Sequence, residues 1–153
     1  MADVNLNPIF SRIGAIGGAN IYNAAVTTSD GVGNTGSNMT RVFMSDANNG
    51  SYVQRLRLSP VGAANNIATT ATVFRVYYST VVANNTTTSA ADTHLIAEVY
   101  SPSQTASGNV NVVFPLEVQL GFAMANNTSI IVSAHHVMAA NSGWKAIVFG
   151  GNY

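Results

Sequence analysis

The sequence has no cysteine and little charge. Without cysteine it can form no disulfide, no thiol nucleophile and no cysteine-bound zinc site. Charged residues make up 8% of its 153 residues, against roughly 25% in an average soluble domain. Six basic residues balance six acidic ones. Binding to nucleic acid or to an anionic membrane surface needs clustered lysine and arginine, so the composition argues against both.

Long apolar runs are also missing. No stretch approaches the ~18 consecutive apolar residues that predict a transmembrane helix. The N-terminal sequence MADVNLNPIF lacks the basic stretch and apolar run of a secretory signal, so we expect the chain to fold in a cytosol. The hydrophobic fraction of 47% is ordinary for a folded protein, and the length predicts a single domain with its own core.

Eight strands are predicted after residue 18. They are rich in Val, Ile, Thr, Tyr and Phe, which suit a pleated, half-buried surface, and the Asn, Gly, Ser and Asp clusters between them are typical of turns. The predicted strands span residues 19–28, 39–44, 51–59, 70–80, 94–101, 109–118, 128–137 and 143–150. A short helix is the alternative for the segment SAADTHLIAEVY.

The apolar residues of these strands alternate with period two. Leu56, for example, lies on the face opposite Arg57. One face is apolar throughout, which predicts an all-β fold: an antiparallel β-sandwich of about eight strands, jelly-roll-like. In the last strand, Lys145, Ile147 and Phe149 share the second face, which mixes a charge with apolar residues. We expect neighbouring subunits to cover such a face.

The first eighteen residues differ from the rest. Residues 1–18 hold a local apolar cluster and end in Gly17 and Gly18, which disfavour a continuing helix. The members of the cluster are Ile9, Phe10, Ile13 and Ile16. We predict an arm or docking segment at 1–18, followed by a single sandwich domain at 19–153. The alternative is an ordinary terminal segment that packs on its own domain.

Two local patterns resemble ligand sites. Residues 31–36 match the dinucleotide-binding pattern G-x-G-x-x-G, but a strand follows where that site needs a helix, so we predict a loop. The chain has three histidines, His94, His135 and His136. Adjacent strand residues face opposite sides, so we expect one of the paired histidines on each face and no shared metal ion.

The six carboxylates are spread along the chain. They are Asp3, Asp30, Asp46, Asp92, Glu98 and Glu117. General acid/base catalysis needs two groups placed together with shifted pKa values, and no nucleophile or metal-ligand motif accompanies these residues. We therefore predict a non-enzymatic protein that requires no metal and no cofactor.

Four of the six basic residues lie within or beside predicted strands, opposite the core face. They are Arg41, Arg55, Arg57 and Arg75. We predict an intersubunit ion-pair surface formed by them. Solvated arginines on an exposed sheet face are the alternative.

Aromatic residues at strand positions suggest a second kind of binding. They are Tyr77, Tyr78, Tyr100 and Trp144. Aromatic side chains in strands usually belong to the core, but exposed ones would suit a carbohydrate ligand.

The C-terminal part carries a family resemblance. Residues 114–153 read FPLEVQLGFAMANNTSIIVSAHHVMAANSGWKAIVFGGNY, and NNGSYVQRLRLSPVG and ATVFRVYYS precede them. This order resembles small, cysteine-free virion proteins of tailed bacteriophages, some of which are capsid decoration (cement) proteins. The resemblance covers roughly residues 30–153. The chain departs from it in the longer loop VVANNTTTSAAD and in residues 1–18, and no functional residue is carried over.

The resemblance implies a role and partners. It implies a non-enzymatic protein on the capsid surface that binds and stabilises the shell of major capsid protein, and that is assembled in the cytoplasm of the bacterial host. It also implies self-association, as a homotrimer, and no nucleic-acid or membrane partner. The alternative function is a tail or baseplate module that binds host-surface carbohydrate through exposed tyrosines and Trp144.

Overall fold

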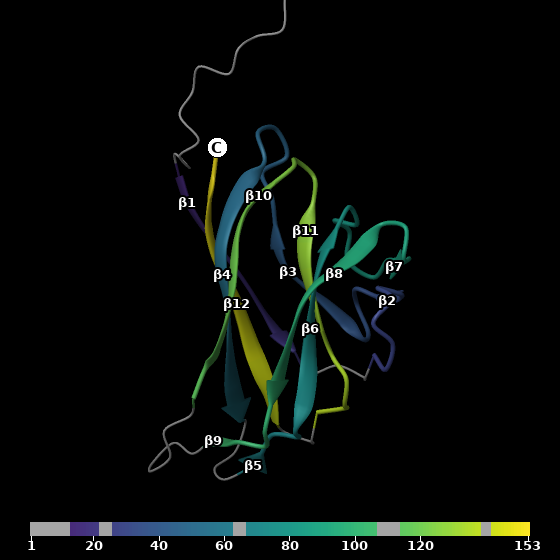
Figure 1. Ribbon diagram of the computed structural model, residues 1–153, viewed down its shortest axis with the longest axis vertical. Helices are drawn as coiled ribbons and strands as arrows, with labels where there is room; N and C mark the ends of the chain where they lie inside the picture. Colours follow the sequence, from purple (N-terminus) through teal and green to yellow (C-terminus); the bar gives the residue numbers. More distant parts are fainter. Residues whose placement is uncertain (1–12, 22–25, 63–66, 107–113, 139–141) are drawn as a thin grey trace, which may run out of the picture.

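The computed structural model of the chain describes residues 13–21, 26–62, 67–106, 114–138 and 142–153, and within these ranges every regular element is a β-strand (Figure 1). Eight strands are long: β1 (Ile13–Ile21), β3 (Met39–Met44), β4 (Ser51–Gly62), β6 (Thr72–Ser79), β8 (Thr93–Ser101), β10 (Leu116–Met124), β11 (Ser129–Ala134) and β12 (Ser142–Asn152). Four have two residues each: β2 (Gly33–Asn34), β5 (Ile67–Ala68), β7 (Thr87–Thr88) and β9 (Thr105–Ala106). The prediction of an all-β protein is confirmed.

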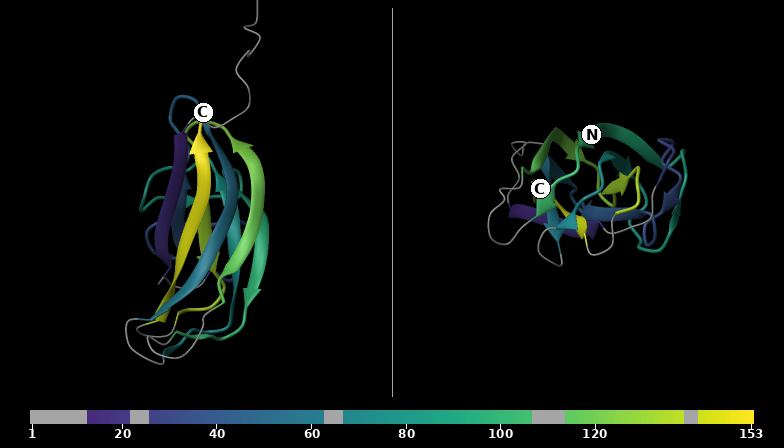
Figure 2. Two further views of the ribbon diagram at one scale, coloured as in Figure 1. Left: turned by 90° about the vertical axis from the view of Figure 1, so that its left-hand side faces the viewer. Right: turned by 90° about the horizontal axis from the view of Figure 1, so that it is seen from below.

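The long strands form two four-stranded sheets that pack face to face (Figure 2). Sheet I has the order β1-β12-β4-β10, and sheet II has the order β3-β11-β6-β8. All pairings within them are antiparallel. Counted along the chain, the long strands follow the order 1-8-3-6 in sheet I and 2-7-4-5 in sheet II. This is a jelly-roll arrangement, so the predicted antiparallel sandwich is confirmed.

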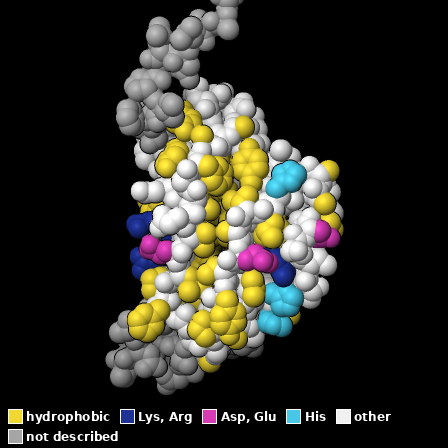
Figure 3. All heavy atoms as spheres, in the orientation of Figure 1, with side chains coloured by type: hydrophobic (Ala, Val, Ile, Leu, Met, Phe, Trp, Pro, Cys, Tyr) yellow, Lys and Arg dark blue, Asp and Glu magenta, His cyan; other side chains and the backbone are white. Residues whose placement is uncertain are grey.

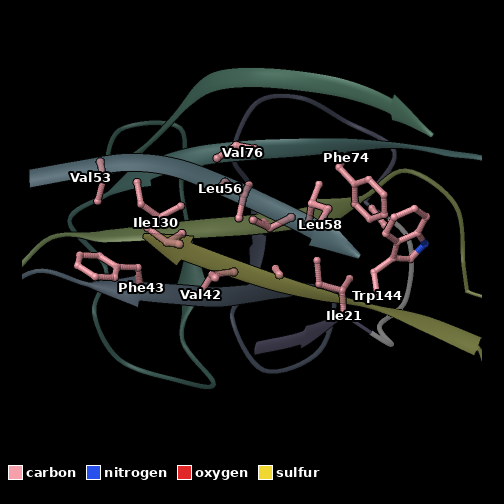
Figure 4. Close-up of a cluster of buried hydrophobic side chains, with 14 of the residues drawn as sticks. Ile21, Val42, Phe43, Val53, Leu56, Leu58, Phe74, Val76, Ile130 and Trp144 are labelled. Atoms are coloured by element: carbon pink, nitrogen blue, oxygen red, sulfur yellow. The ribbon is translucent and has the colours of Figure 1, made fainter. Parts of the chain in front are cut away.

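The main core fills the space between the sheets. Its side chains come from alternate strand positions, as period two requires. Trp144 packs edge to face on Phe74 with 4.9 Å between ring centroids, and Leu56 and Leu58 beside them are fully buried (Figure 4). Burial of each such side chain contributes about 1.5–3 kcal/mol. The core therefore joins strands from the two sheets into one body.

The N-terminal boundary predicted at residue 18 is wrong. Residues 13–18 form the first part of β1, which pairs with β12 at the edge of sheet I. A β-carbon at Gly17 would overlap the carbonyl oxygen of Val42 on β3. Glycine here permits the close approach of two strands and does not end the element. Residues 1–12 lie outside the described residues.

One predicted strand is displaced along the chain. We predicted a strand at 109–118, but β10 begins at Leu116 and continues to Met124. Residues 109–113 lie outside the described residues. Gly121 has a positive φ of 66°, and the pairing of β10 with β4 shifts register beside it. The glycine therefore marks a β-bulge within the strand and not its end.

Other strand limits also differ from the prediction. The segment for which a helix was the alternative forms β8, which pairs with β6 along its length. The first predicted strand ends early, because β1 stops at Ile21 and Thr28 belongs to a loop. At the other end of the chain, β11 stops at Ala134, before the two adjacent histidines.

Sheet II carries a second layer on its outer face. Segments 26–38 and 80–92 cover it and pair with each other through β2 and β7. The Thr88 hydroxyl donates a hydrogen bond to the Gly31 carbonyl at 2.6 Å. Beneath this layer lies a second small core of four buried side chains: Val26, Met39, Tyr77 and Ile131. The outer face of sheet II is thus covered by the chain itself.

Candidate functional site

The glycine-rich segment 31–36 is a loop, as predicted. Strand β3 follows it, not a helix. The Val32 amide donates to Asp30 Oδ1 at 3.1 Å, and the Gly36 amide donates to Asn34 Oδ1 at 2.9 Å. These amides are therefore occupied by side chains of the same loop. The segment holds the outer layer of sheet II and does not have the geometry of a dinucleotide site.

The paired histidines lie differently from the prediction. The chain leaves β11 after Ala134, so the alternation of a regular strand no longer applies. The rings of His135 and His136 meet edge to face, with 4.7 Å between their centroids. The prediction of one ring on each face is wrong for this reason. Among the described residues, no group of three or more His, Asp or Glu side chains is placed to hold a metal ion.

The carboxylates of the outer layer organise turns. The Thr28 hydroxyl donates to Asp30 at 2.8 Å and is the main cause of its lowered pKa. The Ser89 amide donates to Asp92 at 2.9 Å and is the main cause of the lowered pKa of that residue. Hydrogen bonds to the charged form favour ionisation. Both side chains are acceptors held by their own loops.

The four arginines do not form one surface. Arg41 on β3 and Arg75 on β6 belong to sheet II, whereas Arg55 and Arg57 on β4 belong to sheet I. The predicted grouping is therefore wrong, because period two assigns a residue to a face without assigning its strand to a sheet. Arg55 and Arg57 share the outer face of sheet I, and Arg41 and Arg75 stand on the outer face of sheet II, opposite Ile131 and Ser133 of β11.

Arg75 has a structural position. Its Nε atom lies 2.7 Å from Glu98 Oε1, and its Nη1 atom donates to the carbonyls of Val26 and Thr28 at 2.9 and 3.0 Å. The side chain is only 11% exposed. Arg75 thus ties the outer layer to sheet II and is not available as a contact for a partner.

None of the described segments forms such a layer on the outer face of sheet I. Figure 2 shows its four strands, with no described segment lying over them. Ile16 on β1 is 72% exposed and stands opposite Phe149 on β12. The half-buried Ile147 stands opposite Gly18, which has no side chain to cover it. We call this surface the bare face and define it by Ile16, Ile147, Phe149, Arg55, Arg57 and Lys145.

Charge on the bare face is mostly positive. The Arg55 guanidinium lies over the Phe149 ring, 4.8 Å from its centroid, and its Nη1 atom lies 3.5 Å from Glu117 Oε2. Arg57 and Lys145 have no ion pair among the described residues. The face therefore combines apolar side chains with basic groups at strand positions.

A groove opens along one side of the sandwich. It lies between β8 and β10, which are edge strands of different sheets. Its volume is about 380 Å³. Tyr78 and Phe122 meet edge to face within it at 6.1 Å. We call this surface the open side and define it by the lining residues Tyr78, His94, Ile96, Gln119, Leu120, Phe122 and Ala123.

The open side is apolar along its length. Figure 3 shows a band of hydrophobic side chains that runs down the middle of the molecule, with carboxylates on both flanks. Ile96 on β8 is 39% exposed, and Leu120 on β10 is half-buried. Within the described part of the chain, β8 and β10 are edge strands, so each also has a backbone edge without a neighbouring strand there.

The residues predicted for carbohydrate binding are mostly inaccessible. Trp144 and Tyr77 are fully buried, and Tyr78 is half-buried at the open side. Only Tyr100, which is 63% exposed, offers an exposed aromatic ring of the predicted set. Trp144 therefore belongs to the core, and the carbohydrate hypothesis loses its main residue.

The predicted N-terminal cluster is divided. Ile9 and Phe10 lie outside the described residues, whereas Ile13 and Ile16 are exposed on β1.

The sequence analysis did not predict the open side. Nothing in the linear pattern brings β8 and β10 together, since they meet only through the packing of two sheets.

Comparison of the chain with protein-family models, with curated proteins and with solved structures gave no match. In the described part of the chain, no helix has the length and apolar character to cross a membrane.

Proposed function

We propose that this chain is a structural protein of a tailed-bacteriophage virion, a capsid decoration protein that binds and stabilises the shell of major capsid protein. The bare face is the observation that carries the proposal. Exposed and half-buried apolar side chains are held there on a rigid four-stranded sheet, and such a surface is suited to packing against a neighbour. Jelly-roll sandwiches are also common among viral capsid domains.

The composition supports the same role. With six basic and six acidic residues in the chain, few contacts to a shell would be ion pairs. Screening by salt acts on charges and leaves apolar contacts largely intact. A decoration protein of this kind would remain bound at high ionic strength.

The number of copies per particle tests the proposal. A decoration protein is present in hundreds of copies, as the resemblance implies, and its band on a gel of purified virions is then comparable to that of the major capsid protein. A band that corresponds to a few copies would overturn the proposal in favour of a tail or baseplate module.

Binding to bare capsids provides a second test. The purified chain is expected to bind them saturably, to remain bound when salt is raised, and to raise the temperature at which they fall apart. Ile16→Arg is expected to weaken binding, because it replaces the most exposed apolar side chain of the bare face, on the edge strand β1, with a charge. A matched control is Val137→Arg, since Val137 is 60% exposed on a loop after β11. Equal binding by both variants would show that the bare face does not contact the shell.

A further inference from the structure

We propose that Asn49, in the turn between β3 and β4, is a deamidation site whose reaction is slowed by the folded turn. Asn49 and Gly50 form the one asparagine-glycine pair of the sequence, and the Asn49 side chain is exposed. The product is an aspartate or isoaspartate that forms without an enzyme. The inference goes beyond the proposed function and does not rest on it, because the purified chain alone carries the reaction.

The reaction needs only these two residues and water. The main-chain nitrogen of Gly50 loses its proton to the solvent and attacks Cγ of Asn49. A bond between these two atoms forms, the bond from Cγ to Nδ2 breaks, and Nδ2 takes up a proton and leaves as ammonia. Water then opens the five-membered succinimide at either carbonyl, which gives aspartate or isoaspartate. Glycine favours the attack because it has no β-carbon to obstruct the approach.

Hydrogen bonds within the turn engage the reacting main chain. The Gly50 amide, which is the attacking group, donates to the Asp46 carbonyl at 3.2 Å. The Asn48 and Asn49 amides donate to Asp46 Oδ1 at 2.9 and 2.8 Å. The Asn49 amide is the main cause of the lowered pKa of Asp46, and the Asn48 amide adds to it. The side chain that holds the turn is therefore an ionised carboxylate at neutral pH, which is a strong acceptor.

Contacts with two other segments fix Gly50 itself. Gly50 is buried and has a positive φ of 77°. A β-carbon there would overlap the carbonyl oxygen of Met124 at the end of β10, and the Tyr153 amide donates to the Gly50 carbonyl at 3.4 Å. Figure 1 shows the turn at the same end of the sandwich as the C-terminus. Ring closure requires the main chain between Asn49 and Gly50 to rotate, so the turn must open first.

The product is expected to loosen the turn. Deamidation adds a carboxylate close to that of Asp46, and isoaspartate also adds a carbon atom to the main chain. The longer main chain displaces Gly50 from its narrow space beside Met124. The reacted chain should therefore unfold at a lower temperature than the unreacted chain.

Peptide mapping by mass spectrometry measures the reaction in the purified full chain. The folded chain and the chain unfolded in guanidinium are incubated in parallel at the same mildly alkaline pH and temperature. We expect Asn49 to react more slowly in the folded chain by about tenfold or more, because the turn must open first. Asn48 is the internal control, since it is also exposed but is followed by asparagine, and in the unfolded chain it should react more slowly than Asn49.

Two outcomes of this comparison would overturn the proposal. Equal rates at Asn49 in the folded and unfolded chains would show that the turn gives no protection. An unfolded chain in which Asn49 reacts no faster than Asn48 would show that the site is wrongly assigned.

The variant Asp46→Ala tests the turn directly. It removes the acceptor of two amides, so deamidation of Asn49 in the folded chain should become several-fold faster. The matched control is Asp92→Ala, which removes a carboxylate that accepts from the Ser89 amide in another turn and should leave the rate at Asn49 unchanged. An unchanged rate in Asp46→Ala, or equal acceleration in both variants, overturns the role of Asp46. Circular dichroism checks that each variant is folded. If Asp46→Ala is not, Asp46→Asn replaces it with a smaller expected acceleration, since a neutral oxygen accepts more weakly.

Discussion

The two sheets differ in what covers their outer faces. On sheet II, segments 26–38 and 80–92 bury Tyr77 and Ile131 under a second layer. On sheet I, Ile147 remains half-buried and Ile16 is exposed. Both outer faces carry apolar residues at strand positions, so the period-two pattern is the same. An apolar outer face thus predicts that another surface packs against it. Only the folded structure shows whether that surface belongs to the same chain.

Ile131 and Ile147 form a matched pair for this comparison. Both are isoleucines on outer faces, but Ile131 is fully buried and Ile147 is not. Ile131→Ala is expected to lower the free energy of unfolding by about 2–5 kcal/mol, because it leaves a cavity under the outer layer. Ile147→Ala is expected to cost less than about 1 kcal/mol in dilute solution. Urea unfolding measures both.

The dependence of stability on protein concentration distinguishes Ile147→Ala from Ile131→Ala further. If neighbouring copies cover the bare face, the cost of Ile147→Ala grows with concentration, since association stabilises the folded state. The cost of Ile131→Ala should not change. A cost of Ile147→Ala that does not change with concentration would show that copies of this chain do not cover the bare face.

Arg75 and Arg57 extend the comparison to charge. Arg75 donates to two backbone carbonyls of the outer layer and pairs with Glu98, whereas Arg57 has no ion pair among the described residues. Arg75→Met is expected to cost about 1–3 kcal/mol, because two carbonyls of the outer layer and the Glu98 carboxylate lose a charged donor. Arg57→Met is expected to stay within about 0.5 kcal/mol. Thermal or urea unfolding measures the stability of both variants. A larger loss of stability for Arg57→Met than for Arg75→Met would contradict the structural role assigned to Arg75.

The sequence predicted the sandwich because its central strands have one core face. In β4, Leu56 and Leu58 are fully buried while Arg55 and Arg57 are not. The same alternation correctly assigned Trp144 and its neighbour Lys145 to opposite faces of β12. Strand alternation is a local property, so one sequence suffices to detect it.

The prediction failed where the cause is not local. Gly17 was interpreted as the end of a segment, but it permits close contact between β1 and β3. The predicted strand stopped at residue 118, but β10 continues through Gly121, which forms a bulge. The arginines were grouped because a face can be predicted, while membership of sheet I or sheet II depends on pairing between distant strands. The open side was missed for the same reason, since β8 and β10 are brought together only by the packing of the sheets.

Gly14 and Gly17 test how β1 joins the sandwich. A β-carbon at Gly17 would overlap the Val42 carbonyl oxygen, whereas one at Gly14 would have no atom within 4 Å. Gly17→Ala is expected to cost about 1–2 kcal/mol, because β1 must move away from β3. Gly14→Ala is expected to be neutral or slightly stabilising, since alanine restricts the unfolded chain. Thermal unfolding compares them, and equal stability of the two variants would mean that β1 does not pack against β3.

The smallest expected effect is on acid stability, and it also belongs to the outer layer of sheet II. Asp30 and Asp92 lie in the two segments of this layer, and their pKa values are lowered by the Thr28 hydroxyl and the Ser89 amide respectively. A carboxyl whose pKa is lower folded than unfolded contributes stability above its unfolded pKa of about 3.9 and loses it as pH falls through the folded value. As far as these two carboxylates are concerned, the urea concentration at the midpoint of unfolding should therefore change little between pH 8 and pH 5. It should decrease once the pH is below about 4. In the variant Asp30→Asn the urea midpoint should decrease less steeply in acid, so that the difference in midpoint between the variant and the unaltered chain becomes smaller towards pH 3.

Hydrogen exchange provides a second measurement. The exchange rates of the Met39 and Ile131 amides beneath the layer should rise in acid before that of the Trp144 amide in the main core. A difference that widens in acid, or exchange that rises first in the main core, would show that these carboxylates do not hold the outer layer.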